Sequence, residues 1–131
     1  MRNEVIEDIR STELHLFAIW VEGEIVGGIQ WAEETDPDYR HASIDIYIDP
    51  QRHRQGLGPD AVRTLAHDLF TRHAHHRISI DPAADNEPAA RCYTKVRFRP
   101  VGILRRYERD NDGQWRDGLL MDMLASDQLM P

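Results

Sequence analysis

A basic turn with two glycines, residues 51–58, stands between a strand pattern and a helix pattern, and its residue types suit anion binding. The turn has the sequence Gln-Arg-His-Arg-Gln-Gly-Leu-Gly, so two arginines and a histidine share one short segment. Gly56 and Gly58 allow the backbone to approach a ligand closely. The start of the following helix points unpaired N–H groups and a partial positive charge at the same place. We therefore predict a site for a phosphate or pyrophosphate group at this turn.

Two other side chains could take part in chemistry, although each also fits an ordinary structural role. Asp45 interrupts an apolar strand between Ile44 and Ile46, where it is either a functional carboxylate or a solvent-facing strand residue. Tyr93 lies on the apolar face of a predicted helix, a position more often used for packing. Cys92 is interpreted as a small buried hydrophobe, because no activating base is evident for it. The residue types alone leave the roles of Asp45 and Tyr93 open.

Two charged clusters also have more than one interpretation. The acidic loop 33–38 is either a solvated loop or an electrostatic cradle for an amine. The histidines within 73–76 follow a predicted helix, where cations complement the helix dipole. Their spacing does not match a closed zinc site, and no metal is predicted.

The composition narrows the class of protein. A chain of 131 residues suits one domain with one modest core. The net charge of −7 disfavours nonspecific nucleic-acid binding, which needs a basic face, and suits a cationic small molecule. No apolar run approaches the roughly 20 residues that span a bilayer, and the acidic, polar N-terminus does not resemble a signal peptide. A single cysteine excludes an internal disulfide and favours a cytoplasmic location.

The hydrophobic periodicity predicts strands and helices that alternate through the middle of the chain. The first two strands are expected to form a hairpin around the turn at 22–24, and the strands on either side of the long helix should be parallel. This pattern indicates an α/β protein with a mixed sheet. Strands are predicted over 14–21, 25–31, 43–48, 77–81, 98–103 or beyond, and 118–124. Helices are predicted over about 59–72 and 86–96, and Asp85 or Asn86 can cap the second helix.

The order of these motifs resembles the GNAT superfamily of acetyl-CoA-dependent N-acetyltransferases. A strand, an Arg/Gln-x-x-Gly-x-Gly/Ala turn, a helix, a second strand and an Asn-x-x-Ala-x-x-x-Tyr helix follow one another, and the likeness covers roughly residues 14–124. Segments 33–37, 43–45 and 91–95 resemble the aminoglycoside 6′-N-acetyltransferase branch. The resemblance implies a GNAT-like α/β fold, with a mostly antiparallel mixed sheet, a central parallel strand pair and flanking helices.

The resemblance implies that acetyl-CoA is the acetyl donor and assigns residues to its binding. Backbone N–H groups of the turn would hold the pyrophosphate, the strand before the turn would offer its backbone to the pantetheine arm, and Asn86 would bond that arm. The implied donor-binding residues are Ile46, Tyr47, Ile48, His53, Arg54, Gln55, Gly56, Leu57, Gly58 and Asn86.

The same resemblance gives Asp45 and Tyr93 catalytic roles in direct acyl transfer, without a covalent enzyme intermediate. Asp45 would act as general base or attract the ammonium group of the acceptor. Tyr93 would protonate the leaving thiolate, and the two groups have reference pKa values of about 10 and 8.5.

The chain departs from the family pattern at four positions. His53 stands where Arg or Gln is usual and Arg54 where Gly is common, while Pro59 removes one N–H from the helix start. These changes should weaken donor binding rather than abolish it. Arg97 stands where a Gly usually precedes Phe98. A left-handed helix end there would cost on the order of 1 kcal/mol.

The beginning of the chain is short for this family. Members usually have a strand and one or two helices before the hairpin, and here about a dozen residues precede Leu14. We interpret residues 1–131 as a single GNAT-like domain that is N-terminally shortened, with Val5 to Arg10 as the tail of a second helix. Loss of an edge strand would expose sheet surface, which a homodimer would cover.

Three functions are consistent with these observations. The first is acetyl transfer to a primary amine of a small molecule such as an aminoglycoside, as in antibiotic resistance. The second is a siderophore or protein N-terminal acyltransferase on the same scaffold. The third is a non-catalytic acyl-CoA-binding remnant.

Overall fold

A computed structural model of the chain describes residues 4–11, 15–53 and 56–128. Within them it has seven strands and two α-helices, and one short 3₁₀ turn follows the fourth strand and another follows the last strand. The strands are β1 (Glu4–Ser11), β2 (His15–Val21), β3 (Glu24–Glu34), β4 (His41–Ile48), β5 (Arg77–Ile80), β6 (Arg99–Arg109) and β7 (Trp115–Leu124). The helices are α1 (Leu57–Thr71) and α2 (Glu87–Val96), and the 3₁₀ turns are Pro50–Arg52 and Ala125–Asp127.

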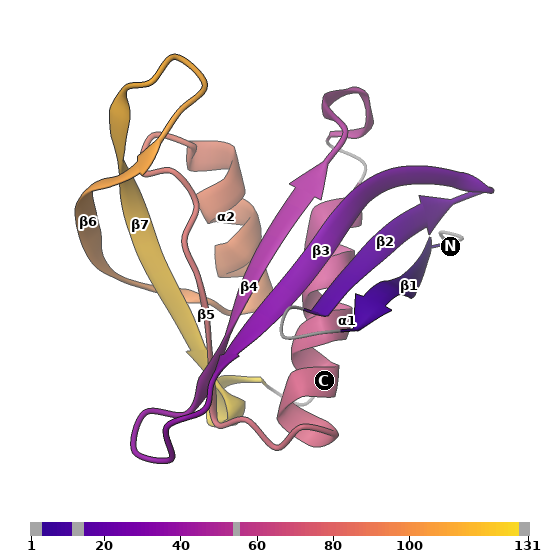
Figure 1. Ribbon diagram of the computed structural model, residues 1–131, viewed down its shortest axis with the longest axis horizontal. Coiled ribbons are helices and arrows are strands. Elements are labelled where there is room, and N and C mark those ends of the chain that lie inside the picture. The colour runs from indigo at the N-terminus through magenta and orange to yellow at the C-terminus, as the bar shows by residue number, and fades with distance from the viewer. Residues whose placement is uncertain (1–3, 12–14, 54–55, 129–131) are drawn as a thin grey trace.

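The strands form one mixed sheet in the order β1-β2-β3-β4-β5-β7-β6. Only β4 and β5 run parallel among the described strand pairs, and every other neighbouring pair is antiparallel. The long helix α1 connects this parallel pair (Figure 1). The predicted fold class, a mostly antiparallel mixed sheet with a central parallel pair, is therefore confirmed.

Both helices pack on one face of the sheet, which lies behind the strands in Figure 1. Helix α1 buries the apolar side of its helical pattern, including Leu65 and Leu69, against the inward-facing residues of the strands. Helix α2 closes the same core with Val96, and Phe98 follows it. Neither described helix is long and apolar enough to cross a membrane.

The N-terminal segment is a strand, so its interpretation as the tail of a helix was wrong. Strand β1 pairs antiparallel with β2. Val5, Ile6 and Ile9 are β-branched, which favours a strand where the edge of a hairpin is available for pairing.

The two strands of the C-terminal hairpin extend past the apolar segments 98–103 and 118–124, since β6 reaches Arg109 and β7 begins at Trp115. These outer ends are mostly charged and lack apolar alternation, so periodicity did not reveal them. A turn at 110–114 closes the hairpin, because Asp110 Oδ1 accepts the backbone N–H groups of Asp112 and Gln114.

Helix α2 begins and ends where the sequence predicts. Asn86 caps its start by accepting the N–H of Ala89. Arg97 ends it in the left-handed region with φ of 98°. The predicted left-handed helix end is therefore present, and Arg97 adopts a conformation that suits glycine better.

The parallel pair separates soon after it forms. Strands β4 and β5 pair only from Ala42 opposite Ile78 to Ile44 opposite Ile80. The chain leaves β5 at Ile80, while β4 continues along β3 to Ile48. Among the described strands, none therefore pairs with the remaining part of β4 on its β5 side, and this gap positions the site.

Candidate active site

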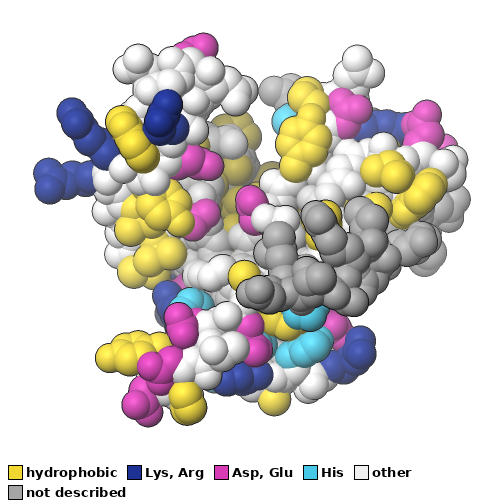
Figure 2. Space-filling view, viewed as in Figure 1, with side chains coloured by type: hydrophobic (Ala, Val, Ile, Leu, Met, Phe, Trp, Pro, Cys, Tyr) yellow, Lys and Arg dark blue, Asp and Glu magenta, His cyan; other side chains and the backbone are white. Residues whose placement is uncertain are grey.

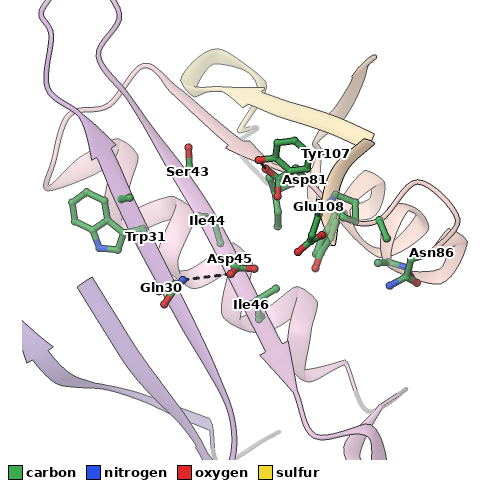
Figure 3. A pocket seen from close by; sticks show the side chains of 16 residues that line it. Gln30, Trp31, Ser43, Ile44, Asp45, Ile46, Asp81, Asn86, Tyr107 and Glu108 are labelled. Atoms are coloured by element: carbon green, nitrogen blue, oxygen red, sulfur yellow. Dashed lines mark hydrogen bonds between the residues drawn. The ribbon is translucent and has the colours of Figure 1, made fainter. Parts of the chain in front are cut away.

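A pocket of about 660 Å³ opens where β4 and β5 part. Figure 3 shows Asp45 and Gln30 on one side of it and Asp81, Tyr107 and Glu108 on the other. Figure 2 shows acidic side chains on both sides of a hollow near the centre of the strand face. The described residues that line the pocket include these three carboxylates and no Lys, Arg or His. The pocket therefore favours a cationic ligand.

Asp45 and Tyr93 line the same pocket although they come from a strand and a helix. Asp45 projects from the exposed side of β4, and Gln30 Nε2 donates to its Oδ2 at 3.4 Å. Tyr93 is half-buried on α2 and meets the ring of Phe98 edge-on at 6.2 Å. Asp45 is thus an exposed strand residue and Tyr93 a packed helix residue, as the sequence suggested, and both also line the pocket.

Burial raises the pKa of Tyr93 to about 12, and the nearby Cys92 and Asp45 act in the same direction. The phenol is therefore neutral at physiological pH. A neutral phenol can donate a hydrogen bond or a proton to a developing anion.

Asn86 also lines the pocket, at the start of α2. Its Oδ1 accepts the N–H of Ala89 at 3.2 Å. The helix cap uses the oxygen of this side chain and fixes its position, and the amide nitrogen retains its donor capacity.

The outer part of β4 offers backbone groups to the gap. Asp49 N–H donates to Val26 O at 2.7 Å. Because successive residues of a strand bond on opposite sides, Tyr47 bonds toward β3, and Ile46 and Ile48 direct their N–H and C=O groups to the β5 side. Both backbone groups of Ile46 and the N–H of Ile48 are thus directed into the gap, while the side chain of His53 lies at the carbonyl oxygen of Ile48.

The basic turn is only partly described, because Arg54 and Gln55 lie outside the described residues. His53 Nε2 lies 2.9 Å from Ile48 O, so this side chain secures the turn against the end of β4. Gly56 has φ of 75°, which a glycine adopts without strain.

The start of α1 has no side-chain cap. Asp60 N–H reaches Gly56 O, and Pro59 has no N–H to give. The backbone N–H groups of Leu57 and Gly58 belong to the first turn of the helix, which has no intrahelical acceptor for them. The predicted anion site therefore has a helix N-terminus with two amides in its first two positions.

Sequence reasoning did not single out three of the polar residues that line the pocket, Asp81, Tyr107 and Glu108. Tyr107 O–H donates to Asp81 Oδ2 at 2.6 Å. This hydrogen bond is the largest cause that raises the pKa of Tyr107 to about 12. Asp81 had a usable signal, because it directly follows a strand parallel to the one that carries Asp45. Tyr107 and Glu108 had none, since they lie in a charged strand end.

Three acidic side chains of segment 33–38 make contacts within the protein. Glu33 Oε1 lies 2.7 Å from His75 Nε2 and 3.4 Å from Arg40. Glu34 and Asp36 accept backbone N–H groups within the loop. The pocket lining contains none of the four acidic residues of segment 33–38.

Trp31 both packs and lines the pocket, and it is only 4% exposed. Its ring stacks on His15 at 4.2 Å and meets His73 edge-on at 4.9 Å. Among the described residues, no group of three or more His, Cys, Asp or Glu side chains is arranged to hold a metal ion.

With this geometry established, the sequence itself matches a known family. The acetyltransferase (GNAT) family matches residues 2–98. The chain belongs to this family, which confirms the resemblance found in the sequence.

Of two curated relatives, one is named as an aminoglycoside acetyltransferase and the other as a kanamycin resistance protein. An aminoglycoside N(6′)-acetyltransferase type 1 from Klebsiella pneumoniae is 38% identical over 75 residues, which are 56% of this chain and 36% of that protein. A kanamycin resistance protein from Rhizobium radiobacter is 36% identical over 77 residues, 59% of this chain and 70% of that protein. The chain thus matches little more than a third of the length of the first relative.

Solved structures with the same fold act on other amines. A spermidine N-acetyltransferase from Vibrio cholerae has a TM-score of 0.79 at 22% identity, covering 91% of this chain and 69% of that one. A ribosomal-protein-S5-alanine acetyltransferase from Vibrio fischeri has a TM-score of 0.80 at 21% identity, covering 90% and 65%. At these identities the likeness establishes the fold alone.

Proposed function

We propose that this protein transfers an acetyl group from acetyl-CoA to a primary amine of a small cationic molecule, such as an aminoglycoside. The observation that carries the proposal is the pocket between β4 and β5, where Asp45 and the neutral Tyr93 line one cavity without a basic side chain among the described lining residues. Membership of the GNAT family and the aminoglycoside-modifying relatives support it.

The described residues fit acetyl-CoA as donor. The backbone groups of Ile46 and the N–H of Ile48 face the gap, where an extended amide-containing arm can pair with them as a strand would. Asn86 has an amide nitrogen to donate from the pocket wall. Leu57 and Gly58 place helix N-terminal N–H groups for a pyrophosphate. When bound, acetyl-CoA supplies an activated acetyl thioester.

Asp45 and Tyr93 divide the proton handling in this proposal. The Asp45 carboxylate binds the acceptor's ammonium group and accepts its proton, directly or through water, so that the nitrogen lone pair can attack. A C–N bond forms, the C–S bond breaks, and the electron pair of that bond leaves on sulfur. Tyr93 stands to donate its hydroxyl proton to that sulfur.

The decisive experiment is Asp45→Asn, measured by CoA release with kanamycin, spermidine and an N-terminal alanine peptide as acceptors. We expect kcat/KM for the preferred amine to fall about 100-fold, a typical loss for a general base. Binding of acetyl-CoA, measured by calorimetry, should stay within about twofold because the donor site keeps its backbone groups.

Asp36→Asn is the matched control, since Asp36 is an exposed carboxylate outside the pocket lining and Asn can still accept the Asp38 N–H. It should leave kcat/KM unchanged. Wild-type protein that releases no CoA with any of these acceptors would contradict the proposal. Donor binding without turnover would instead identify a non-catalytic acyl-CoA-binding protein, and turnover with the peptide alone would identify an N-terminal acyltransferase.

A further inference from the structure

The hydroxyl of Tyr107 is bound to a carboxylate inside the pocket, although Tyr107 lies in β6, a strand whose residues are mostly exposed. It donates to Asp81 Oδ2 at 2.6 Å, and the two residues are 26 positions apart in the chain. Both line the pocket that also contains Asp45 (Figure 3). Tyr107 as a whole residue remains 46% exposed, so burial does not account for its position.

An irregularity in β6 turns Tyr107 toward the pocket. Between the pairs Leu104 opposite Gly118 and Glu108 opposite Arg116, β6 has three residues where β7 has one. Arg106, in the middle of them, has φ of 47°, in the left-handed region that non-glycine residues seldom adopt. Bulges of this kind redirect side chains at functional sites.

The opposite strand accommodates this arrangement. Asp117 Oδ1 accepts the N–H of Arg106 at 2.8 Å, which holds the left-handed residue in place. A Cβ atom at Gly118 would lie 2.9 Å from Cδ2 of Tyr107, closer than side chains pack. The absence of a side chain at Gly118 therefore makes room for the tyrosine ring.

The loop that carries Asp81 is fixed to the same strand. Leu119 N–H donates to Pro82 O at 2.8 Å, and Ala84 N–H donates to Asp117 O at 2.9 Å. Asp117 thus holds the Arg106 backbone through its side chain and the Asp81 loop through its main chain. The distance between Tyr107 and Asp81 is set by one short piece of β7.

We propose that Tyr107 is a positioning residue for the amine acceptor, acting through Asp81. Its hydroxyl occupies one carboxylate oxygen and holds the group in one orientation, which leaves the other oxygen to bind an ammonium group of the acceptor. A neutral phenol donates this bond and leaves the negative charge of Asp81 in place. Arg or Lys would donate too, but would cancel that charge. The β6–β7 hairpin thereby takes part in acceptor selection. This inference rests on the proposed function.

The raised pKa of Tyr107 is consistent with this geometry. Besides the bond to Asp81, the charges of Glu108 and Asp45 help keep the phenol protonated. The hydroxyl of Tyr107 therefore stays protonated, and can donate a hydrogen bond, throughout the pH range around neutrality.

The test is a double-mutant cycle with Tyr107→Phe, Asp81→Asn and the combined variant. For kanamycin and for spermidine, Tyr107→Phe should raise KM about tenfold, as expected for loss of a hydrogen bond to a charged group. The KM for acetyl-CoA should not change. In the Asp81→Asn background, Tyr107→Phe should have almost no further effect on the acceptor KM, because its partner charge is already absent.

Two measurements separate this role from simple hairpin stabilisation. Thermal unfolding shows whether Tyr107→Phe weakens the fold, and Tyr39→Phe, at an exposed tyrosine outside the pocket lining, is the control. Calorimetric titration of kanamycin and spermidine into the protein without donor reports acceptor binding independently of turnover.

The outcomes distinguish the two proposals. Wild-type protein that neither binds nor acetylates these amines would overturn the proposed function and this inference with it. Active wild-type protein with an unchanged acceptor KM in Tyr107→Phe would overturn this inference alone. Equal effects of Tyr107→Phe in the wild-type and Asp81→Asn backgrounds would also overturn it, because Tyr107 would then act independently of Asp81.

Discussion

At the scale of single residues, the structure shows how an ordinary packing residue can also line the pocket. Tyr93 packs edge-on against Phe98, yet its side chain lines the pocket. Asp45 occupies the exposed side of a strand and lines the same pocket. For both residues, the structural and functional interpretations of the sequence describe different parts of one environment.

Replacement of Tyr93 tests its proposed role as donor to the leaving sulfur. Tyr93→Phe keeps the ring that packs against Phe98 and removes the hydroxyl, so we expect kcat to fall by about 10- to 100-fold, at or below the usual range for general acids. The free energy of unfolding should change by less than about 1 kcal/mol.

The pH profile provides a second check on Tyr93. Because its pKa is raised to about 12, the donating form persists well above pH 10, and wild-type activity should show no loss from Tyr93 ionisation below that pH. Steady-state rates between pH 6 and 10 measure this. A variant with wild-type kcat throughout that range would remove Tyr93 from the mechanism.

At the scale of elements, the site depends on the residue at which β4 stops pairing with β5. The sequence predicts β4, α1 and β5 and their parallel arrangement, because each has a clear local pattern. The early end of the ladder at Ile44 and Ile80 has no comparable local signal. It follows from the hydrogen bonds that Leu119 and Asp117 of β7 make with the loop after Asp81, because these bonds hold that loop away from β4.

The close approach of β3 to the open part of β4 gives a prediction about two neighbouring glycines. A Cβ at Gly27 would lie 2.2 Å from Tyr47 O, whereas a Cβ at Gly28 would lie 3.6 Å from Phe17 O. Gly27→Ala should therefore cost about 1–3 kcal/mol, as overpacking does, and should weaken acetyl-CoA binding by displacing the β4 backbone. Gly28→Ala should be tolerated.

Urea unfolding and donor titration of the two variants test this prediction. Each replaces a glycine by the same residue on the same strand, so differences in the unfolded state largely cancel. Similar stability of Gly27→Ala and Gly28→Ala would show that β3 and β4 can separate without cost. The bulge between β2 and β3, where Val26 is the extra residue, lies next to Gly27.

At the scale of the whole molecule, His75 joins three parts of the fold. Its backbone N–H donates to Leu69 O at the end of α1, and its fully buried ring lies beside Glu33 and meets Trp31 edge-on. Burial is the largest cause that lowers the pKa of His75 below its ordinary value of 6.5, and Arg40 adds to it, while Glu33 opposes the shift.

This lowered pKa predicts how stability depends on pH. The unfolded chain takes up a proton on His75 near pH 6.5, and the folded chain does so only at lower pH. The contribution of the neutral His75 ring to the free energy of unfolding is therefore fully present above pH 6.5. It is lost as the pH falls toward the pKa of the folded state, with a slope of at most about 1.4 kcal/mol per pH unit. His75→Gln should reduce this acid sensitivity.

Urea unfolding at pH 7, 6 and 5 measures the slope. His67→Gln, at an exposed position on α1, is the control and should retain the wild-type slope. If His75→Gln and wild-type protein lose stability in parallel, other groups account for the acid sensitivity.

The predicted homodimer and the predicted cytoplasmic location stay predictions.

The sequence by itself determined the elements and the family. Strand alternation, the apolar face of α1, the Asn86 cap and the glycine turn are local patterns, and each arises from residues within a few positions of one another. The left-handed end of α2 at Arg97 was predictable for the same reason. The N-terminal segment was not, because its conformation depends on pairing with β2.

Only the tertiary structure decided the shape and composition of the pocket. Tyr107 meets Asp81 across 26 positions of sequence, and it does so through a bulge in β6, a left-handed Arg106 and the space beside Gly118. No local pattern encodes such a meeting, because it depends on the packing of two strands against a loop. The sequence thus specified the parts proposed to bind the donor, and the packing of the sheet assembled the pocket wall proposed to face the acceptor.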